Sequence, residues 1–557
     1  MLKAYPFSFL SRQAQIESLE ETTFDLIVIG GGVTGAGIAL DASSRGLKTL
    51  LLEKGDFASG TSSKSTKLIH GGLRYLKQFD FWLVKEVGSE RAIVHELAPH
   101  LVLPEKMLLP LVEGGSYGKW LTSFGLKVYD LLAQVTETDK RQMLDPVAAI
   151  QKEPLLPVEG LNGAGYYAEY RTDDARLTLE ILKTSLRYGA LVLNYIAVEE
   201  FIYDSGGRIK GVRARDVLGS KSIGIKSKNV INAAGPWVDA LRTCDGSKQG
   251  KELHLTKGVH LVFPHHKFPV RQSVYFDVPD GRMIFAIPRG NCTYVGTTDT
   301  DFHGNPDNVH TDLADAVYLI AAVNHMFPSI NLELEDIESS WAGLRPLIHE
   351  AGKSASELSR KDEIFISPSG LLSIAGGKLT GYRKMAERAV NRLLALMEEH
   401  GQPLKPCFTE KIPLCGNTFK NFKAVRKYAG EIASRLEPFG ISEQKAWELV
   451  TTYGSQTDQI LGATEFNKTS DVHWQLLKAE VDFCIGHEMA TSPADFFMRR
   501  TGKLYFDIES VRNYLSPVIE VFREHMKATE EQVQIWADYL ELEIRQHTNF
   551  DPNTYLG

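Results

Sequence analysis

The sequence has few cysteines, and none of them forms a Cys-x-x-Cys pair. The five cysteines are Cys244, Cys292, Cys407, Cys415 and Cys484. An odd number of widely spaced cysteines in a chain of 557 residues does not build a disulfide framework. The simplest interpretation is a reduced, cytosolic setting.

The sequence also lacks a long apolar run. No segment approaches the roughly 18 apolar residues that a membrane-spanning helix needs. Residues 1–21 contain no continuous apolar segment, and acids stand where a signal peptide would be cleaved. We therefore expect a cytoplasmic protein, while a peripheral contact with a membrane stays open.

An excess of basic residues and a zinc motif are missing as well. Acids outnumber bases 70 to 62, which gives a net charge of −8 and argues against nucleic acid as the main partner. His95, His349 and His487 each precede a glutamate, but none has a second histidine four residues further on. We predict no catalytic metal.

The segment 24–53, FDLIVIGGGVTGAGIALDASSRGLKTLLLE, is the most informative stretch that is present. It contains apolar strands at Leu26–Ile29 and Thr49–Leu52, the glycines Gly30, Gly32 and Gly35, and the acid Glu53. The glycines allow a tight turn, a close approach of a pyrophosphate and close packing of helix on strand. The helix N-terminus attracts phosphate, and the acid can accept ribose hydroxyls. The order predicts a dinucleotide site, although an ordinary βαβ turn would also use such glycines.

Two later features favour FAD over a nicotinamide cofactor. Residues 59–76 form a loop rich in hydroxyl groups that contains Lys67 and can wrap a diphosphate. The segments Val230–Gly235 and Ile374–Thr380 read as strands that end in small residues, where a backbone can approach a cofactor. A nicotinamide-linked dehydrogenase is the weaker alternative, because its domain would continue into further βα units.

The chain is too long for one hydrophobic core, so we expect two or three domains. Residues 401–416 contain three prolines and read as a linker. Beyond them, amphipathic helices are predicted at Glu443–Thr452, Val472–Ile485, Ile508–Met526 and Glu530–Ile544. A C-terminal helical domain follows from this pattern.

Several longer motifs make the sequence resemble the FAD-dependent glycerol-3-phosphate dehydrogenases, within the D-amino-acid-oxidase-like flavoproteins. They are IGGGVTGAGIALDASSRGL at 29–47, TSSKSTKLIHGGLRYL at 61–76, DDARLTLE at 173–180, NAAGPWVD at 232–239, KGVHLVFP at 257–264, VGTTDT at 295–300, WAGLRPL at 341–347 and GGKLTGYRKMAE at 376–387. HGGLRYL, GLRPL and GGKLT-x-YRKMAE are specific to this group.

The resemblance implies an α/β fold with a Rossmann-like FAD-binding domain, an interleaved mixed-sheet (α+β) substrate domain and a C-terminal α-helical cap. We predict the FAD-binding domain at 24–100, 160–245 and 335–398, the substrate-binding domain at 101–159 and 246–334, and the cap at 417–557.

A phosphorylated substrate needs fixed cationic donors, and three cations stand beside glycines in separate motifs: Arg74, Arg345 and Lys378. By resemblance they line the substrate pocket together with Tyr75 and Arg360. Taken singly, each would more often be a surface cation or an ion-pair partner, and only the three motifs together reverse that preference. His70 and His260 lie in motifs expected near the flavin, and either could accept a proton or only hold structure. We name His70, His260 and Arg345 as the candidate catalytic residues.

The candidate cofactor-binding residues are Gly30, Gly32, Gly35, Glu53, Thr61, Ser62, Lys67, Leu68, Val198, Ala234, Gly235, Gly343, Gly377, Lys378, Leu379 and Thr380. The segment Lys119–Gln134 is amphipathic. It could lie on the inner face of the cell membrane and reach a quinone, or it could pack into a core.

The resemblance therefore implies oxidation of sn-glycerol 3-phosphate to dihydroxyacetone phosphate, with hydride passing to flavin N5 and electrons to a quinone. An oxidase that releases hydrogen peroxide and a flavin-binding regulator without turnover are the alternatives. The sequence is compatible with a homodimer and leaves the oligomeric state open.

Overall fold

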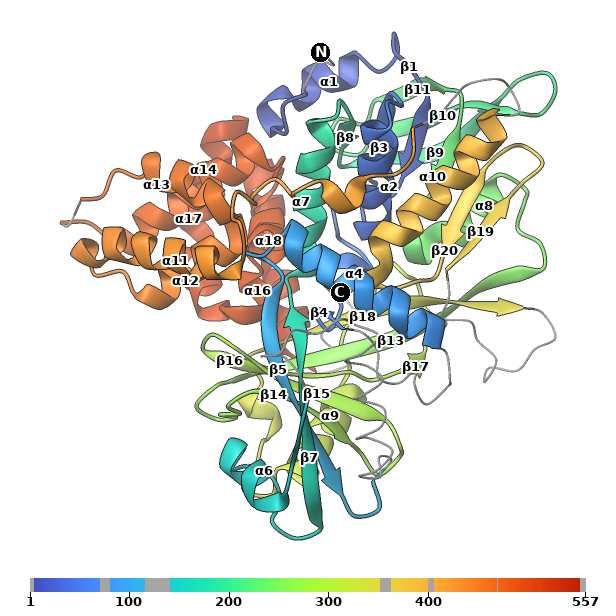
Figure 1. The fold of residues 1–557 in the computed structure, drawn as a ribbon. Coiled ribbons are helices and arrows are strands. Elements are labelled where there is room, and N and C mark those ends of the chain that lie inside the picture. The colour runs from blue at the N-terminus through green and yellow to red at the C-terminus, as the bar shows by residue number, and fades with distance from the viewer. Residues whose placement is uncertain are drawn as a thin grey trace.

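The computed structural model describes residues 5–70, 81–115, 141–350, 362–398, 405–467 and 469–550. Three sheets run through these ranges, and a block of helices lies to one side of them (Figure 1). The predicted fold class is confirmed by this mixed α/β arrangement with a helical C-terminal region.

The first sheet is built from short, fully buried apolar strands, as a sheet covered on both faces requires. Its order is β19-β20-β12-β2-β3-β8, and β2 lies between β12 and β3. The bounds are β2 Leu26–Ile29, β3 Thr49–Leu52, β8 Leu191–Leu193, β12 Val230–Asn232, β19 Glu363–Ile366 and β20 Leu372–Ala375. Its neighbours pair in parallel except β19 with β20, so the ends of β2, β3, β12 and β20 share one edge.

Helices α2, α7 and α10 pack together beside this sheet. Their bounds are α2 Val33–Ser44, α7 Asp174–Leu186 and α10 Tyr382–Glu398. Helix α2 is buried at every residue except Thr34, as expected for a helix between neighbours. Further elements of this part are α1 Arg12–Glu17, α4 Phe81–Leu97 and α8 Val238–Cys244.

A second, smaller sheet has the order β1-β11-β10-β9. It consists of β1 Thr23–Phe24, β9 Ile196–Tyr203, β10 Ile209–Asp216 and β11 Ser222–Ser227.

The third sheet is large and mixed. Its path runs β17-β13-β16-β15-β14-β5-β7-β4, with β18 paired to β13 and β6 paired to β7. The bounds are β4 Leu68–Ile69, β5 Leu103–Val112, β6 Gln142–Leu144, β7 Leu161–Arg171, β13 Lys251–Pro264, β14 Ser273–Asp277, β15 Met283–Arg289, β16 Cys292–Gly296, β17 Thr300–Asp301 and β18 Ser339–Glu350. Strands β7 and β18 fall in ranges assigned to the FAD-binding part but pair in this sheet, so the domain boundaries stay a proposal.

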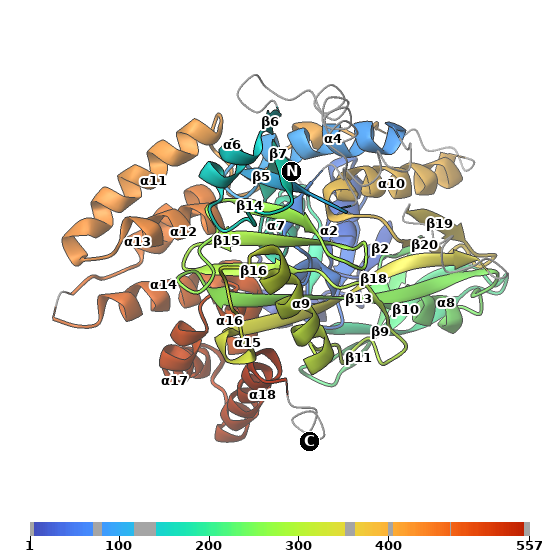
Figure 2. The same ribbon diagram turned by 90° about the horizontal axis from the view of Figure 1, so that it is seen from below.

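The large sheet buries both faces, because alternate residues of a strand point to opposite sides. Leu261 and Phe263 pack in a cluster with helix α9 Leu313–Met326, whereas Val262 packs in a cluster with the C-terminal helices. Figure 2 shows α9 across the sheet from below, with the short helix α6 Pro146–Lys152 near β6 and β7. One hydrophobic core therefore continues from this sheet into the C-terminal region.

In the described residues of the C-terminal region, the regular elements are all helices. Its helices are α11 Phe422–Leu436, α12 Glu443–Tyr453, α13 Thr457–Gly462, α14 Val472–His487, α15 Pro493–Asp495, α16 Lys503–Phe506, α17 Ile508–Met526 and α18 Glu530–Thr548. The four predicted helices all form, with starts as predicted. No helix in the described ranges is long and apolar enough to cross a membrane.

Candidate active site

The glycine turn has the tight geometry that its sequence predicts. Gly30 has a φ of +114°, and a Cβ there would lie 2.5 Å from the carbonyl oxygen of Ala233. A Cβ on Gly35 would lie 1.9 Å from the carbonyl oxygen of Gly30. The turn thus brings β2, the N-terminus of α2 and the end of β12 into contact, and only glycine fits at these two positions.

Glu53 ends β3 beside this turn. Its Oε2 accepts a hydrogen bond from the Gly31 N–H at 2.6 Å, and its Oε1 accepts one from the Gly55 N–H at 2.8 Å. Burial raises the pKa of this carboxyl, while the two amides act in the opposite direction. The N–H of Ile196 at the start of β9 bonds the Glu53 carbonyl at 2.8 Å. Val198 follows two residues further along that strand.

The hydroxyl-rich loop covers the N-terminus of α2. The Val33 N–H donates to Ser62 Oγ at 2.9 Å, and a Cβ on Gly32 would lie 3.0 Å from the same oxygen. Thr61 Oγ1 donates to the Leu344 carbonyl on β18 at 2.7 Å. A cofactor at the glycine turn would therefore continue along this loop.

A cavity of about 220 Å³ opens beside the loop and collects many of the predicted residues. Among its lining residues are Thr61, Ser62, Leu68, His70, His260, Gly343, Arg345, Gly377, Lys378, Leu379 and Thr380. They come from the loop, from β13, β18 and from the turn between β20 and α10. Segments far apart in sequence thus meet at one site.

Glycines make room for these side chains. A Cβ on Gly343 would lie 2.6 Å from the Lys64 carbonyl oxygen, and one on Gly258 would lie 2.5 Å from Arg345 Nη2. Gly377 has a φ of +89°, and a Cβ there would lie 2.3 Å from Met385 Sδ. A side chain at any of these three positions would collide with a neighbour, so each position requires glycine.

Arg345 is fixed from one side by the segment after β16. Its Nη1 donates to the Thr298 carbonyl at 3.1 Å and to Asp299 Oδ1 at 3.0 Å, and its Nη2 donates to Thr297 Oγ1 at 2.8 Å. The side chain keeps 31% of its surface exposed. A guanidinium held in this way presents a rigid, planar fork.

The two candidate histidines have different surroundings. His260 is buried and stacks on Trp341 with 4.7 Å between ring centroids, and its Nε2 lies 3.0 Å from Thr66 Oγ1. Burial, with smaller effects of Arg345 and Lys67, holds its pKa well below 6.5. His70 is half-buried, and burial, followed by Lys378 and Arg91, lowers its pKa to about 4. Both rings are neutral at physiological pH.

Lys67 does not line this cavity. Its ammonium is buried behind the loop and donates to Asp174 Oδ1 at 2.5 Å, so the structure gives it a protein partner in place of a diphosphate. Ala234 and Gly235 follow β12 next to the glycine turn. Arg74, Tyr75, Arg360 and the segment Lys119–Gln134 lie outside the described residues.

Seven lining residues were not predicted as site residues: Val33, Lys64, Ser65, Thr66, Asp174, Gly258 and Leu344. All seven lie within the family motifs quoted above, so the motifs were the signal that could have found them. In the described residues no group of three His, Cys, Asp or Glu side chains could hold a metal ion.

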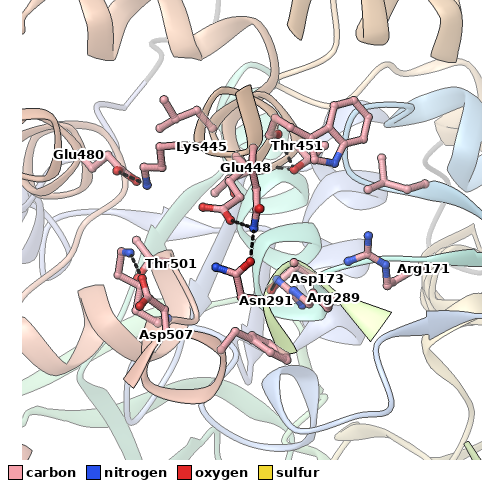
Figure 3. A pocket seen from close by; sticks show the side chains of 18 of the residues that line it. Arg171, Asp173, Arg289, Asn291, Lys445, Glu448, Thr451, Glu480, Thr501 and Asp507 are labelled. Atoms are coloured by element: carbon pink, nitrogen blue, oxygen red, sulfur yellow. Dashed lines mark hydrogen bonds and ion pairs between the residues drawn. The ribbon is translucent and has the colours of Figure 1, made fainter. Parts of the chain in front are cut away.

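A second cavity, of about 420 Å³, lies between the large sheet and the C-terminal helices (Figure 3). Arg289 and Asp173 form an ion pair in it with 2.9 Å between Nη2 and Oδ2, and Lys445 and Glu480 form another at 3.0 Å. None of the predicted site residues lines this cavity. The candidate active site is therefore the cavity beside the loop.

Comparison with known proteins identifies the family. The model of the FAD dependent oxidoreductases matches residues 25–383, and the model of the C-terminal domain of alpha-glycerophosphate oxidase matches residues 407–533. The chain belongs to the FAD-dependent oxidoreductases.

Relatives cover nearly the whole flavoprotein chain. The aerobic glycerol-3-phosphate dehydrogenase of Bacillus subtilis is 49% identical over 531 residues, which is 95% of this chain and 96% of the relative. That of Staphylococcus aureus is 47% identical over 553 residues, 98% and 99% of the two chains. The glycerol-3-phosphate dehydrogenase of Bacillus halodurans, solved with FAD, is 43% identical with a TM-score of 0.83 and covers 98% and 99%.

FAD is the cofactor of this oxidoreductase, and the residues present fit it. The glycine turn brings the N-terminus of α2, which attracts phosphate, next to Glu53 at the end of β3, where an adenosine ribose would lie. The loop then leads from the turn to the cavity that both histidines line. FAD would therefore extend from the glycine turn along the loop to this cavity.

Proposed function

We propose that the enzyme oxidises sn-glycerol 3-phosphate to dihydroxyacetone phosphate in glycerol catabolism and passes the electrons to a quinone. The observation that carries this proposal is the cavity that holds His70 and Arg345 against the loop Thr61–Thr66. The names of the curated relatives, which match 95% or more of the chain, support the substrate.

Arg345 is the proposed anchor of the substrate phosphate. A phosphate dianion is bound best by donors that are already in place, and three contacts hold this guanidinium still. Lys378 lines the same cavity and adds a second positive charge. We propose that Arg74, Tyr75 and Arg360, outside the described residues, complete the substrate site.

His70 is the proposed proton acceptor. Bound FAD supplies the acceptor for the hydride from the alcohol carbon, so the protein has to remove only the hydroxyl proton. His70 lines the cavity and its neutral ring can accept a proton, although a pKa of about 4 makes it a weak base. His260 contacts Thr66 Oγ1 and is packed against Trp341, so we assign it to orienting the loop.

The quinone and the membrane contact are proposed from the sequence. The amphipathic segment Lys119–Gln134 is the sequence feature that favours a peripheral membrane contact, and a homodimer stays part of the proposal. An oxidase that passes electrons to oxygen is the rival, since the matching C-terminal model carries an oxidase name. A flavin-binding regulator without turnover is the second rival.

An anaerobic titration with glycerol 3-phosphate tests the substrate and turnover together. The absorbance of the bound flavin should be lost on addition of substrate and return with a quinone analogue. An unchanged spectrum would favour the regulator. Rapid recovery in air with equivalent release of hydrogen peroxide would favour the oxidase.

Arg345→Lys tests the phosphate anchor. It keeps the charge but loses the planar fork, so kcat/KM for glycerol 3-phosphate should fall by about a hundredfold while FAD content stays intact. Arg213→Lys is the matched control, because Arg213 lies on β10 of the smaller sheet with 53% of its side chain exposed. Near-normal kinetics of Arg345→Lys would remove the residue from the substrate site.

A further inference from the structure

Lys67 is a buried lysine on the far side of the loop that borders the flavin site. Its side chain is 2% exposed, and its ammonium donates to Asp174 Oδ1 at 2.5 Å and to the Ser63 carbonyl at 2.9 Å. The residue has a φ of +57°, a left-handed backbone conformation that residues other than glycine rarely adopt. Such a strained, buried position indicates a specific task for the side chain.

The other oxygen of Asp174 holds the middle of the same loop. Asp174 Oδ2 accepts from the Ser65 N–H at 3.0 Å and from Ser65 Oγ at 2.7 Å. Ser65 Oγ in turn accepts from the Lys67 N–H at 3.0 Å. One carboxylate, itself 0% exposed, thus ties Ser65 and Lys67 of the loop to the start of α7.

The C-terminal region encloses the lysine. The ammonium of Lys67 lies 5.6 Å from the ring centroid of Trp341, and 5.9 Å from those of Tyr505 and Phe506. Tyr505 and Phe506 belong to α16, whereas Trp341 belongs to β18. Aromatic faces attract a desolvated cation, so this cage favours the charged lysine in the interior.

The front of the same loop borders the flavin site. Ser65 and Thr66 line the cavity, the Ser65 carbonyl accepts from Trp341 Nε1 at 3.2 Å, and the Thr66 carbonyl accepts from the Tyr294 hydroxyl at 3.1 Å. Thr66 Oγ1 lies against His260. A displacement of the loop would therefore move both the wall of the cavity and a candidate catalytic histidine.

We propose that Lys67 and Asp174 are positioning residues: together they fix the loop against the flavin, and they balance the buried charge behind it. The pair acts through the loop and through its electric field, since Lys67 does not line the cavity. This inference rests on the proposed function only in placing the flavin ring in the cavity beside the loop.

Because of this charge balance, removing Lys67 and removing the charge of Asp174 should change the midpoint potential of the flavin in opposite directions. Removal of Lys67 leaves Asp173 and Asp174 with less positive charge, and Arg289 remains with Asp173 only. The excess negative charge disfavours electron uptake by the flavin. Removal of the Asp174 charge leaves Lys67 unbalanced and favours electron uptake.

The variants Lys67→Met, Asp174→Asn and the double variant test the proposal, with FAD affinity of the apoprotein and midpoint potential of the bound flavin as measurements. Each single variant should bind FAD about tenfold or more weakly, because a buried charge is left without its partner. The potential should fall in Lys67→Met, rise in Asp174→Asn, and return towards the wild-type value in the double variant. A purely structural role would shift both single variants in one direction.

Asp41→Asn is the matched control. Asp41 pairs with Arg45 near the C-terminal end of α2, both side chains are 1% exposed, and neither lines the cavity. It should lower thermal stability but leave FAD affinity and potential unchanged. An equal change in FAD affinity or potential in this control would overturn the proposal.

Ser65→Ala covers the case in which the charged single variants do not fold. It removes only the Ser65 Oγ contacts and keeps both charges, so FAD affinity should fall by several-fold with little change in potential. Unchanged FAD affinity in Ser65→Ala would overturn the positioning role. Chemical reduction gives the potentials without substrate, so a wild-type protein that fails to oxidise glycerol 3-phosphate would refute the proposed function alone.

Discussion

Glu53 illustrates how much a single carboxylate can do at the residue scale. Both of its oxygens already accept backbone N–H groups, and each has a second lone pair for a ribose hydroxyl. Glu53→Gln removes the charge and exchanges one acceptor for a donor. We expect FAD affinity to fall by roughly 1.5–3 kcal/mol, about 10- to 150-fold, in a titration of the apoprotein.

The control for Glu53→Gln is Glu200→Gln, since Glu200 has 68% of its side chain exposed on β9 of the smaller sheet. It should leave FAD affinity unchanged. Equal affinities for wild type and Glu53→Gln would mean that the ribose lies elsewhere.

We expect His100 to make the protein sensitive to acid. It is fully buried, neither ring nitrogen has a hydrogen-bond partner among the described residues, and burial lowers its pKa to about 4. The unfolded chain, with a histidine pKa near 6.5, binds the proton more readily than the folded chain does. Stability is therefore fully present above pH 6.5 and falls as the pH drops towards 4, by about 3 kcal/mol from this residue.

His100→Leu should remove this part of the acid sensitivity, because it leaves no polar group unpaired. Urea unfolding at pH 7.5 and pH 5 should show a smaller difference in unfolding free energy than in the wild type. His325→Leu, at an exposed position on α9, should keep the full difference. An unaltered pH dependence in His100→Leu would mean that other groups cause the acid sensitivity.

At the scale of elements, the turn between β2 and α2 depends on one contact. A Cβ on Gly35 would lie 1.9 Å from the carbonyl oxygen of Gly30, so Gly35→Ala must push helix and strand apart. We expect a stability loss of about 1–3 kcal/mol and a protein isolated largely without FAD. Thermal denaturation and the ratio of flavin to protein absorbance measure both effects.

Gly224→Ala is the control for the turn. A Cβ at this position on β11 would meet nothing within 4 Å, so the strand can accept alanine there. It should keep its flavin and its melting temperature. If Gly35→Ala retained FAD as well, the turn would be more adaptable than its geometry indicates.

The elements that the sequence predicts are those with a strong local pattern. Strands β2 and β3 and helix α17 have the predicted bounds, because apolar runs and amphipathic periodicity lie within each segment. The order of the large sheet could not be predicted, since β13 pairs with β18 across more than seventy residues and no local pattern encodes that choice. Helix α9 is not among the elements predicted from the sequence.

The candidate site shows the same division. The motifs placed His70, Arg345 and Lys378 in one pocket, and the cavity contains all three. The role of Lys67 could not be predicted, because a lysine in a hydroxyl-rich loop resembles a phosphate ligand until its partner is known. Asp174 and the rings of Tyr505 and Phe506, far away in sequence, decide its surroundings.

At the scale of the whole molecule, buried ion pairs join the C-terminal region to the FAD-binding part. Asp56 is fully buried and accepts from Arg499 Nε at 2.5 Å, from Arg500 Nη1 at 2.7 Å, and from Asn194 Nδ2 at 3.0 Å. Burial alone would raise its pKa, but the two arginines hold the pKa of this carboxyl well below its usual range. Arg176 and Glu488 make a second such link, with 2.5 Å between Nη1 and Oε2.

Asp56→Asn should therefore weaken the attachment of the C-terminal helices. Arg500 would lose its counter-charge and Arg499 would keep only Asp495, at a cost of about 3–5 kcal/mol. Thermal denaturation should show a large loss, and limited proteolysis should release the C-terminal region. Asp458→Asn, at an ion pair with 57% of the aspartate exposed, should cost less than about 1 kcal/mol. Equal losses in the two variants would show that the Asp56 cluster is not a main attachment.

The neighbouring acids Asp173 and Asp174 face different cavities, the first the space beside the C-terminal helices and the second the flavin site. The chain therefore tolerates no insertion at Asp173 and Asp174, because one added residue would turn each carboxylate towards the wrong partner. The exposed turn at 217–221, between β10 and β11, has no such constraint. A peptide tag or a fluorescent domain belongs in that turn, whereas the start of α7 admits no insertion without loss of the flavin.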